Sequence, residues 1–143
     1  MCDLWPLLGR GWAMSDTHEP VVRALTLRQP WATAAAVGLK TIEWRDWRTS
    51  YRGLLLLHAG RVTDDSEAAA AVRHALGPVE YPAGALVGVC RVARCLRYQG
   101  RWAWHLEDAC ELVKPIPWKG DRGLWAVPAD AVRAALRAVG VVV

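Results

Sequence analysis

Short strand-like segments outnumber helical ones in this 143-residue sequence, and most follow one another too closely for a helix to lie between them. Alternating or continuous apolar patterns predict strands at residues 21–27, 41–47, 54–58, 85–96, 102–106, 110–113 and 124–127. Parallel neighbours need long crossover connections, so this spacing favours a mixed or largely antiparallel sheet, which we expect to curl into a small β-barrel. The predicted fold class is α+β.

Three helices are predicted around these strands. The first begins at Pro30, a residue typical of the first helical position, and ends before Gly38. The second covers residues 64–76, with Thr63 or Asp64 as its cap, and the third covers residues 128–139.

All of these elements fit a single domain over residues 21–143, a length that can bury a sizeable core. Residues 1–20 show no consistent hydrophobic period, and we expect them to be a tail that is either disordered or not native to the protein.

Composition places the chain among globular proteins, since 53% of its residues are hydrophobic and 22% are charged. The formal net charge of +4 suits an anionic partner such as nucleic acid but does not demand one. No apolar run reaches the length of a membrane span, and the N-terminus lacks a secretory pattern. The sequence therefore predicts a cytoplasmic protein without a membrane partner.

The four cysteines form no Cys-x-x-Cys pair, and no histidine lies at zinc-ligand spacing from them. The sequence also holds no P-loop and no dinucleotide fingerprint. We therefore expect neither a metal site nor a cofactor. Cys90 and Cys95 are an odd number of residues apart on a predicted strand, which predicts that they face opposite sides of the sheet.

Basic side chains concentrate in one part of the sequence. Residues 21–61 contain seven Arg or Lys against two acidic residues. The turn at residues 28–31 supplies a helix N-terminus that suits a phosphate, and Trp31 offers a ring on which a base can stack. The alternative is an ordinary solvated surface with Trp31 in the core, and the residues alone favour it.

Lys40 and Glu43 are the pair best suited to chemistry, since a desolvated lysine can act as a base and a carboxylate can take a proton. On a regular strand these two residues face opposite sides, so their cooperation requires Lys40 to lie in the turn before the strand. The alternative, a structural salt bridge, is favoured by the residues alone. His58 ends an apolar strand, where a lone histidine is more often structural than catalytic.

Several motifs resemble the ASCH domain family. Its G-x-K-x-x-E-x-R pattern is matched by Gly38, Lys40, Glu43 and Arg45. Further matching segments are found at residues 27–31, 51–53, 56–59, 104–108 and 123–125. The resemblance implies a PUA-like fold, a small β-barrel with helices around it, and a cleft beside the first helix that binds RNA or a modified base.

The resemblance also implies roles for particular residues. Lys40, Glu43 and Arg45 would point into the cleft. The rim would hold Arg28, Gln29 and Trp31, and the floor or wall would hold His58 and Trp104.

One branch of the family hydrolyses acetylated cytidine with a Lys and a Thr from this turn and a distant Glu. The present sequence keeps the lysine as Lys40, has Glu43 at the position of that threonine, and has Thr41 elsewhere. A metal-independent ribonuclease is another variant of the family. The leading hypothesis is a module that binds RNA or a modified nucleoside, as a monomer or a dimer. The alternative is a metal-independent hydrolase, either an N(4)-acetylcytidine amidohydrolase or a ribonuclease, that uses Lys40 and Glu43.

Overall fold

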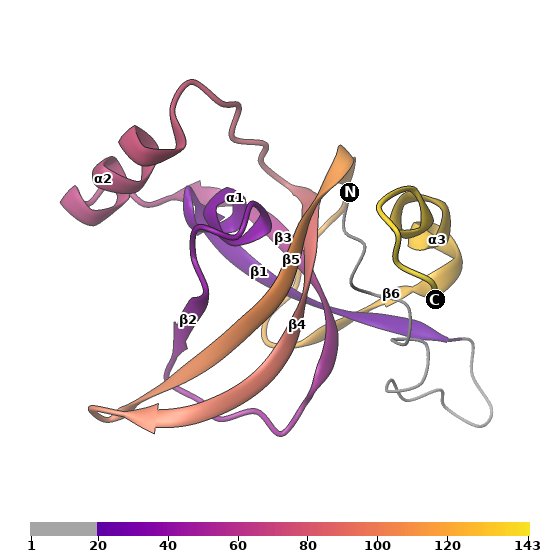
Figure 1. Cartoon of the computed structure of the whole chain (residues 1–143), viewed down its shortest axis with the longest axis horizontal. Helices are drawn as coiled ribbons and strands as arrows, with labels where there is room; N and C mark the ends of the chain where they lie inside the picture. Colours follow the sequence, from indigo (N-terminus) through magenta and orange to yellow (C-terminus); the bar gives the residue numbers. More distant parts are fainter. Residues whose placement is uncertain (1–19) are drawn as a thin grey trace.

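The computed structural model describes residues 20–143, which form six strands and three helices (Figure 1). In chain order these are β1 (Val21–Gln29), α1 (Trp31–Ala36), β2 (Ile42–Arg45), β3 (Gly53–Thr63), α2 (Glu67–Leu76), β4 (Ala85–Tyr98), β5 (Arg101–Pro117), β6 (Trp125–Pro128) and α3 (Ala129–Ala138). The tail predicted for residues 1–20 lies outside the described residues, except for Pro20.

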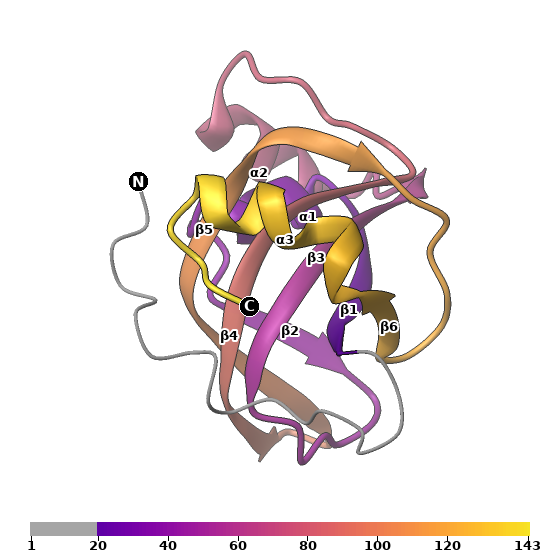
Figure 2. The same cartoon turned by 90° about the vertical axis from the view of Figure 1, so that its right-hand side faces the viewer.

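One mixed sheet carries all six strands in the order β2-β5-β4-β3-β1-β6. β1 and β3 are parallel, and the other neighbouring pairs are antiparallel, as the close spacing of the strand patterns predicted. The sheet is strongly curved (Figures 1 and 2), but within residues 20–143 no strand pair joins its edge strands β2 and β6. The α+β class is confirmed, and the sheet is not a closed barrel.

The long strand β5 differs from the prediction of two strands separated by Glu107 and Asp108. The two acidic residues lie within one continuous strand, where Asp108 has a positive φ of 54°. Arg91 of the neighbouring β4 forms ion pairs with both, at 2.9 Å each. The prediction of a break was wrong because the two carboxylates pair across the strands at an irregularity in the register, instead of ending the sheet.

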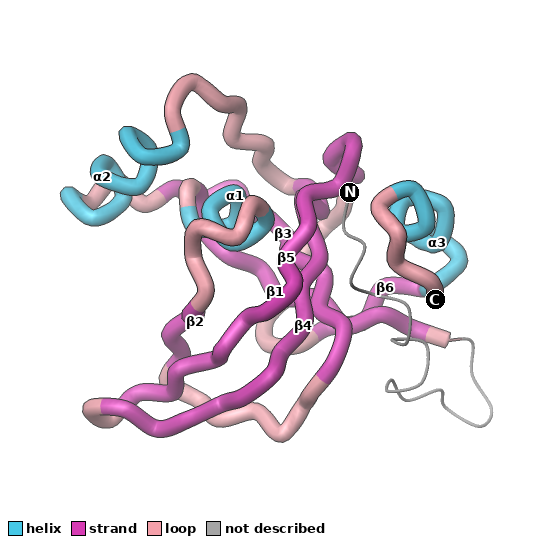
Figure 3. Tube along the Cα trace, viewed as in Figure 1, coloured by secondary structure: helices cyan, strands magenta, loops and turns pink. Residues whose placement is uncertain are grey.

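Both faces of the sheet are covered, and β3 shows this most clearly. Its side chains at 54 and 56 join the core beneath α3, and those at 55 and 57 join the core beneath α1. A strand buried on both faces has a continuous apolar run, which is the pattern seen in residues 54–57. Figure 3 shows α1 and α3 beside the sheet and α2 farther from it.

The short helix α1 lies very close to the sheet. Residues 32–36 of this helix are all buried, and the helix contacts β1, β3, β4 and β5. A Cβ atom added to Gly88 of β4 would lie 2.5 Å from the Cβ of Ala36. The alanine face of α1 and the bare backbone at Gly88 together allow this approach, which fixes the helix against β4.

Two local predictions need correction. The cap of α2 is Ser66, whose hydroxyl accepts a hydrogen bond from the Ala69 amide at 3.2 Å, and neither Thr63 nor Asp64 has this role. Cys90 and Cys95 are both buried in the core beneath α1, so they do not face opposite sides. A register shift in β4 between residues 92 and 94 changes the alternation of its side chains.

Candidate functional site

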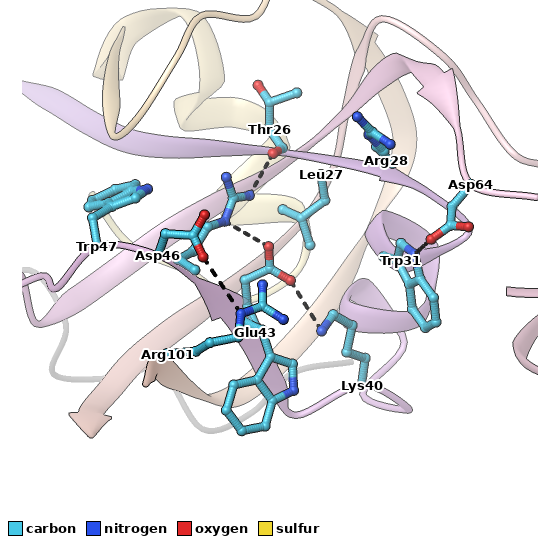
Figure 4. A pocket seen from close by; sticks show the side chains of 12 residues that line it. Thr26, Leu27, Arg28, Trp31, Lys40, Glu43, Asp46, Trp47, Asp64 and Arg101 are labelled. Atoms are coloured by element: carbon cyan, nitrogen blue, oxygen red, sulfur yellow. Dashed lines mark hydrogen bonds and ion pairs between the residues drawn. The ribbon is translucent and has the colours of Figure 1, made fainter. Parts of the chain in front are cut away.

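A cleft of about 680 Å³ opens between β1, α1 and β2 (Figure 4). The residues that line it come from three neighbouring elements and from two segments farther along the chain. They are Thr26, Leu27, Arg28, Trp31, Lys40, Glu43, Trp44, Arg45, Asp46, Trp47, Asp64 and Arg101.

Glu43 is held between two basic side chains in this cleft (Figure 4). Its carboxylate oxygens lie 3.1 Å from Lys40 Nζ and 2.8 Å from Arg45 Nε. Arg45 also donates a hydrogen bond of 2.8 Å to the Thr26 carbonyl, and Lys40 donates one to the Ile42 carbonyl. The Glu43 side chain is only 11% exposed, so these two cations compensate most of the cost of burying its charge.

Lys40 lies before β2, which begins at Ile42, and not on the regular strand. The turn therefore brings Lys40 and Glu43 to the same side, and the salt bridge favoured by the residues alone is confirmed. Glu43 and Arg45 are two residues apart on β2 and share a face because strand side chains alternate.

Trp31 and Asp64 join α1 to the end of β3. The indole Nε1 of Trp31 donates a hydrogen bond of 2.8 Å to the Asp64 carboxylate. Hydrogen bonds from the Ser66 backbone amide, from Trp31 and from the Ser66 side chain lower the pKa of Asp64 to about 2. Asp64 therefore stays charged and fixes the Trp31 ring, while the Lys40 ammonium lies 5.7 Å from the centre of that ring.

The cleft is less basic than the charges of residues 21–61 suggest. Its lining has four basic side chains (Arg28, Lys40, Arg45, Arg101) and three acidic ones (Glu43, Asp46, Asp64). Within residues 20–143, Arg28 is the one basic member that forms no ion pair. Four of the seven basic residues of the segment lie outside the lining (Arg23, Arg48, Arg52, Arg61). The two charged residues that the fold adds from beyond the segment, Asp64 and Arg101, offset each other.

Three residues predicted for the site lie outside the lining of the cleft. Gln29 is buried, and its amide bonds the Thr33 amide and the Pro82 carbonyl at 3.1 and 3.0 Å. Trp104 is fully buried in the core beneath α1. His58 is also buried, and it lines a second cavity. The other predicted residues (Arg28, Trp31, Lys40, Glu43, Arg45) all line the cleft.

The ring of His58 is held at both nitrogens. Nε2 lies 2.7 Å from the Trp118 carbonyl, which can only accept, and Nδ1 lies 3.1 Å from Thr26 Oγ1. Burial lowers the pKa of His58 below its ordinary value of 6.5, against the opposite effect of the Trp118 carbonyl. The imidazole is therefore neutral at pH 7 and donates from Nε2.

We expect the folded protein to lose stability as the pH falls below about 6.5, because the unfolded chain then binds a proton that folded His58 still excludes. The free energy of unfolding should fall by at most about 1.4 kcal/mol per pH unit in this window. Urea unfolding at pH 8.0, 6.5 and 5.5 measures the slope. His58→Gln should flatten it, and His105→Gln should not. Equal slopes in the wild type and His58→Gln would contradict the assignment.

Several lining residues escape prediction from the sequence. Asp64 has the local pattern of a helix cap, whereas Asp46, Trp47 and Arg101 carry no local signal that separates them from surface residues. Arg101 reaches the cleft because its strand, β5, pairs with β2, where Arg45 lies opposite Trp102. Only the pairing of distant strands brings these groups together.

A family model described as the ASCH domain matches residues 25–122. The chain belongs to the ASCH domain family. The match covers the motif from Gly38 to Arg45 and all the residues that line the cleft, so the resemblance seen in the sequence is confirmed.

Among curated proteins, activating signal cointegrator 1 from Mus musculus is 28% identical over 124 residues, and that from Homo sapiens is 27% identical over 124 residues. Each match covers 71% of this chain and 21% of the relative. The ASCH chain therefore spans about a fifth of the length of these relatives.

Two solved structures share the fold. The crystal structure of ASCH from Zymomonas mobilis matches with a TM-score of 0.56 and 12% identity, over 85% of this chain and 97% of that one. The crystal structure of a mutant of the Zymomonas mobilis protein matches with a TM-score of 0.53 and 13% identity, over 81% and 94% of the two chains. At this identity the likeness shows the fold alone.

Neither a membrane-spanning helix nor a metal cluster is found among the described residues. None of the helices in residues 20–143 is long and apolar enough to cross a membrane. Within the same residues, no three His, Cys, Asp or Glu side chains gather in an arrangement that would hold a metal ion.

Proposed function

We propose that this ASCH chain is a nucleic-acid-binding module that takes one nucleoside of single-stranded RNA into the cleft between α1 and β2. The observation that carries the proposal is the composition of the cleft. Trp31, Trp44 and Trp47 line it together with the ion-paired Glu43. Its volume of about 680 Å³ falls in the range of small-molecule sites, and aromatic rings are the usual stacking partners of unpaired bases.

The charge of the cleft supports a base as its occupant, rather than a phosphate. Four basic and three acidic side chains nearly balance, and Lys40 and Arg45 are already paired with Glu43. The Glu43 carboxylate and its two cationic neighbours together present a hydrogen-bond acceptor next to hydrogen-bond donors. That pattern suits a base with an amino group next to a ring nitrogen or carbonyl, as in cytosine. Glu43 would accept from the amino group, and Lys40 or Arg45 would donate to the ring nitrogen or to the carbonyl.

Loss of either basic partner should weaken RNA binding without unfolding the protein. We expect Lys40→Ala and Arg45→Ala each to raise the Kd for a single-stranded RNA oligonucleotide about tenfold, since a hydrogen bond to a charged group contributes about 1.5 kcal/mol or more. Fluorescence anisotropy at fixed salt measures the Kd, and circular dichroism checks the fold. Arg137→Ala removes an exposed charge on α3 and serves as the control. Equal binding by the wild type and Lys40→Ala would refute the proposal.

The second candidate is a metal-independent hydrolase, favoured by the 3.1 Å contact between Lys40 and Glu43 in an open cleft. An ion-paired ammonium has no free lone pair, so Lys40 would stabilise a developing oxyanion and Glu43 would activate water. Each Glu43 oxygen already contacts one cation, so the water would have to use a remaining lone pair of the carboxylate.

Release of acetate from N(4)-acetylcytidine and cleavage of labelled RNA separate the two candidates. RNA binding without turnover supports the binding module. Turnover that disappears in Glu43→Gln supports the hydrolase. Turnover that survives both Lys40→Ala and Glu43→Gln would place the reaction elsewhere.

A further inference from the structure

A second cavity, of about 860 Å³, adjoins the cleft at Thr26, which lines both. Its walls come from the end of β3, the start of β4 and the loop between β5 and β6. Its lining residues are Thr26, His58, Gly60, Arg61, Gly84, Pro117, Trp118, Lys119, Gly120, Asp121 and Arg122. It lies beside the proposed nucleoside site, and the roles assigned to the cleft do not use it.

The charges of the second cavity differ from those of the cleft. Arg61, Lys119 and Arg122 are exposed on its walls, and Asp121 is the one carboxylate in its lining. Within the described part of the chain, none of the three cations forms an ion pair, whereas Lys40 and Arg45 of the cleft are bound to Glu43. Unpaired cations around a hollow are suited to a phosphate.

The loop that carries Lys119 and Arg122 is fixed to the sheet. The Trp118 amide donates to the Gly84 carbonyl at 3.0 Å, and the Trp118 carbonyl lies 2.7 Å from His58 Nε2. Gly120 lies directly over the His58 ring, because a Cβ atom there would be 2.6 Å from His58 Cε1. The loop therefore holds its two cations on a buried support, which reduces the cost of ordering them on binding.

The Arg61 side chain occupies the space that is left free because residue 84 is a glycine. Its guanidinium lies where a side chain on Gly84 would begin, with Nη2 at 3.0 Å from the position of that Cβ. Gly84 also has a positive φ of 63°, a conformation that other residues rarely adopt. The planar guanidinium thus lies against bare backbone at the wall of the cavity. Within residues 20–143 it forms no ion pair with a carboxylate.

We propose that the second cavity binds the backbone phosphate of the nucleotide next to the one whose base occupies the cleft. This inference rests on the proposed function, because it assumes that single-stranded RNA enters the cleft. The near-neutral cleft would take the base, and the unpaired Arg61, Lys119 and Arg122 would take the charge. Thr26, shared by both, would mark the junction between the two subsites.

The test compares Lys119→Ala/Arg122→Ala with the matched control Lys114→Ala/Arg137→Ala, which removes one exposed lysine and one exposed arginine away from both cavities. Anisotropy titrations of a single-stranded RNA oligonucleotide at several salt concentrations give the slope of log K against log salt. The proposed site binds one phosphate, and each lost phosphate contact reduces the magnitude of this slope by about 0.7, so the test variant should lose up to about 0.7. The control variant should keep the wild-type slope, and calorimetry should show unchanged binding of free cytidine to the test variant.

The outcomes separate the inference from the proposed function. If the wild type binds RNA and the test variant keeps its affinity and slope, the second site is refuted and the proposed function stands. If the control variant loses as much slope as the test variant, general surface charge explains the effect and the second site is refuted. If the wild type does not bind single-stranded RNA, both proposals fail.

Discussion

Glu43→Ala is expected to lower the free energy of unfolding by about 3 kcal/mol, because it leaves two largely buried cations without their counter-charge. The side chains of Lys40 and Arg45 are 15% and 23% exposed, and each contacts one oxygen of the Glu43 carboxylate. The measurement is urea unfolding at pH 7, followed by circular dichroism. Glu43→Gln keeps the shape and one acceptor, so its loss should be smaller.

Asp46→Ala provides the comparison for this prediction. Asp46 also lines the cleft, but its side chain is 91% exposed and lies 3.6 Å from Arg101. A pair this exposed contributes little, and we expect a change within about 0.5 kcal/mol. If Glu43→Ala destabilises the protein no more than Asp46→Ala does, Glu43 is not the electrostatic centre of the cleft.

Trp104→Ala should destabilise the protein further, by about 4 kcal/mol, since truncation of a fully buried tryptophan opens a large cavity. The Trp104 ring packs edge-on against Trp47, with 4.7 Å between ring centres, and its Nε1 donates to the Trp47 carbonyl at 3.3 Å. Trp47 lines the cleft, so Trp104 supports the wall from behind. Chemical unfolding measures the loss, and Trp104→Phe should recover much of it because the ring volume is partly kept.

The opposite result would support the position that the family resemblance implies for Trp104, in the floor or wall of the cleft. In that case Trp104→Ala would weaken RNA binding and leave the unfolding midpoint close to that of the wild type. The full burial of the ring argues for the first outcome.

Local sequence patterns predict most of the strands and helices, because strand burial and helix ends depend on residues that are near one another in the sequence. The apolar run of residues 54–57 marks a strand covered on both faces, and Gly38 and Gly77 each follow the end of a helix with positive φ. The prediction divides β5 because Glu107 and Asp108 resemble a turn when read alone. Their partner Arg91 is 16 and 17 residues away, on another strand, so a local sequence pattern cannot reveal this pairing.

The candidate site likewise combines residues that a local motif predicts with residues that only the fold brings together. Lys40, Glu43 and Arg45 belong to one turn and one strand, so a short motif contains them. Asp64 and Arg101 reach the cleft through the pairing of distant strands. Gln29 stands inside the motif segment, yet its side chain turns inward to bond the Thr33 amide and the Pro82 carbonyl. Only the fold separates residues that line the cleft from residues that hold it in shape.

The most direct test of the central claim is photo-crosslinking of the protein to single-stranded RNA that contains 5-iodocytidine, which keeps the amino group of cytosine, with the modified residues mapped by mass spectrometry. A base held in the cleft should produce adducts on Trp31, Trp44 or Trp47, and Arg45→Ala should reduce them. Adducts confined to α3 or to the turn between β4 and β5, or no adduct at saturating RNA, would contradict a nucleoside site between α1 and β2.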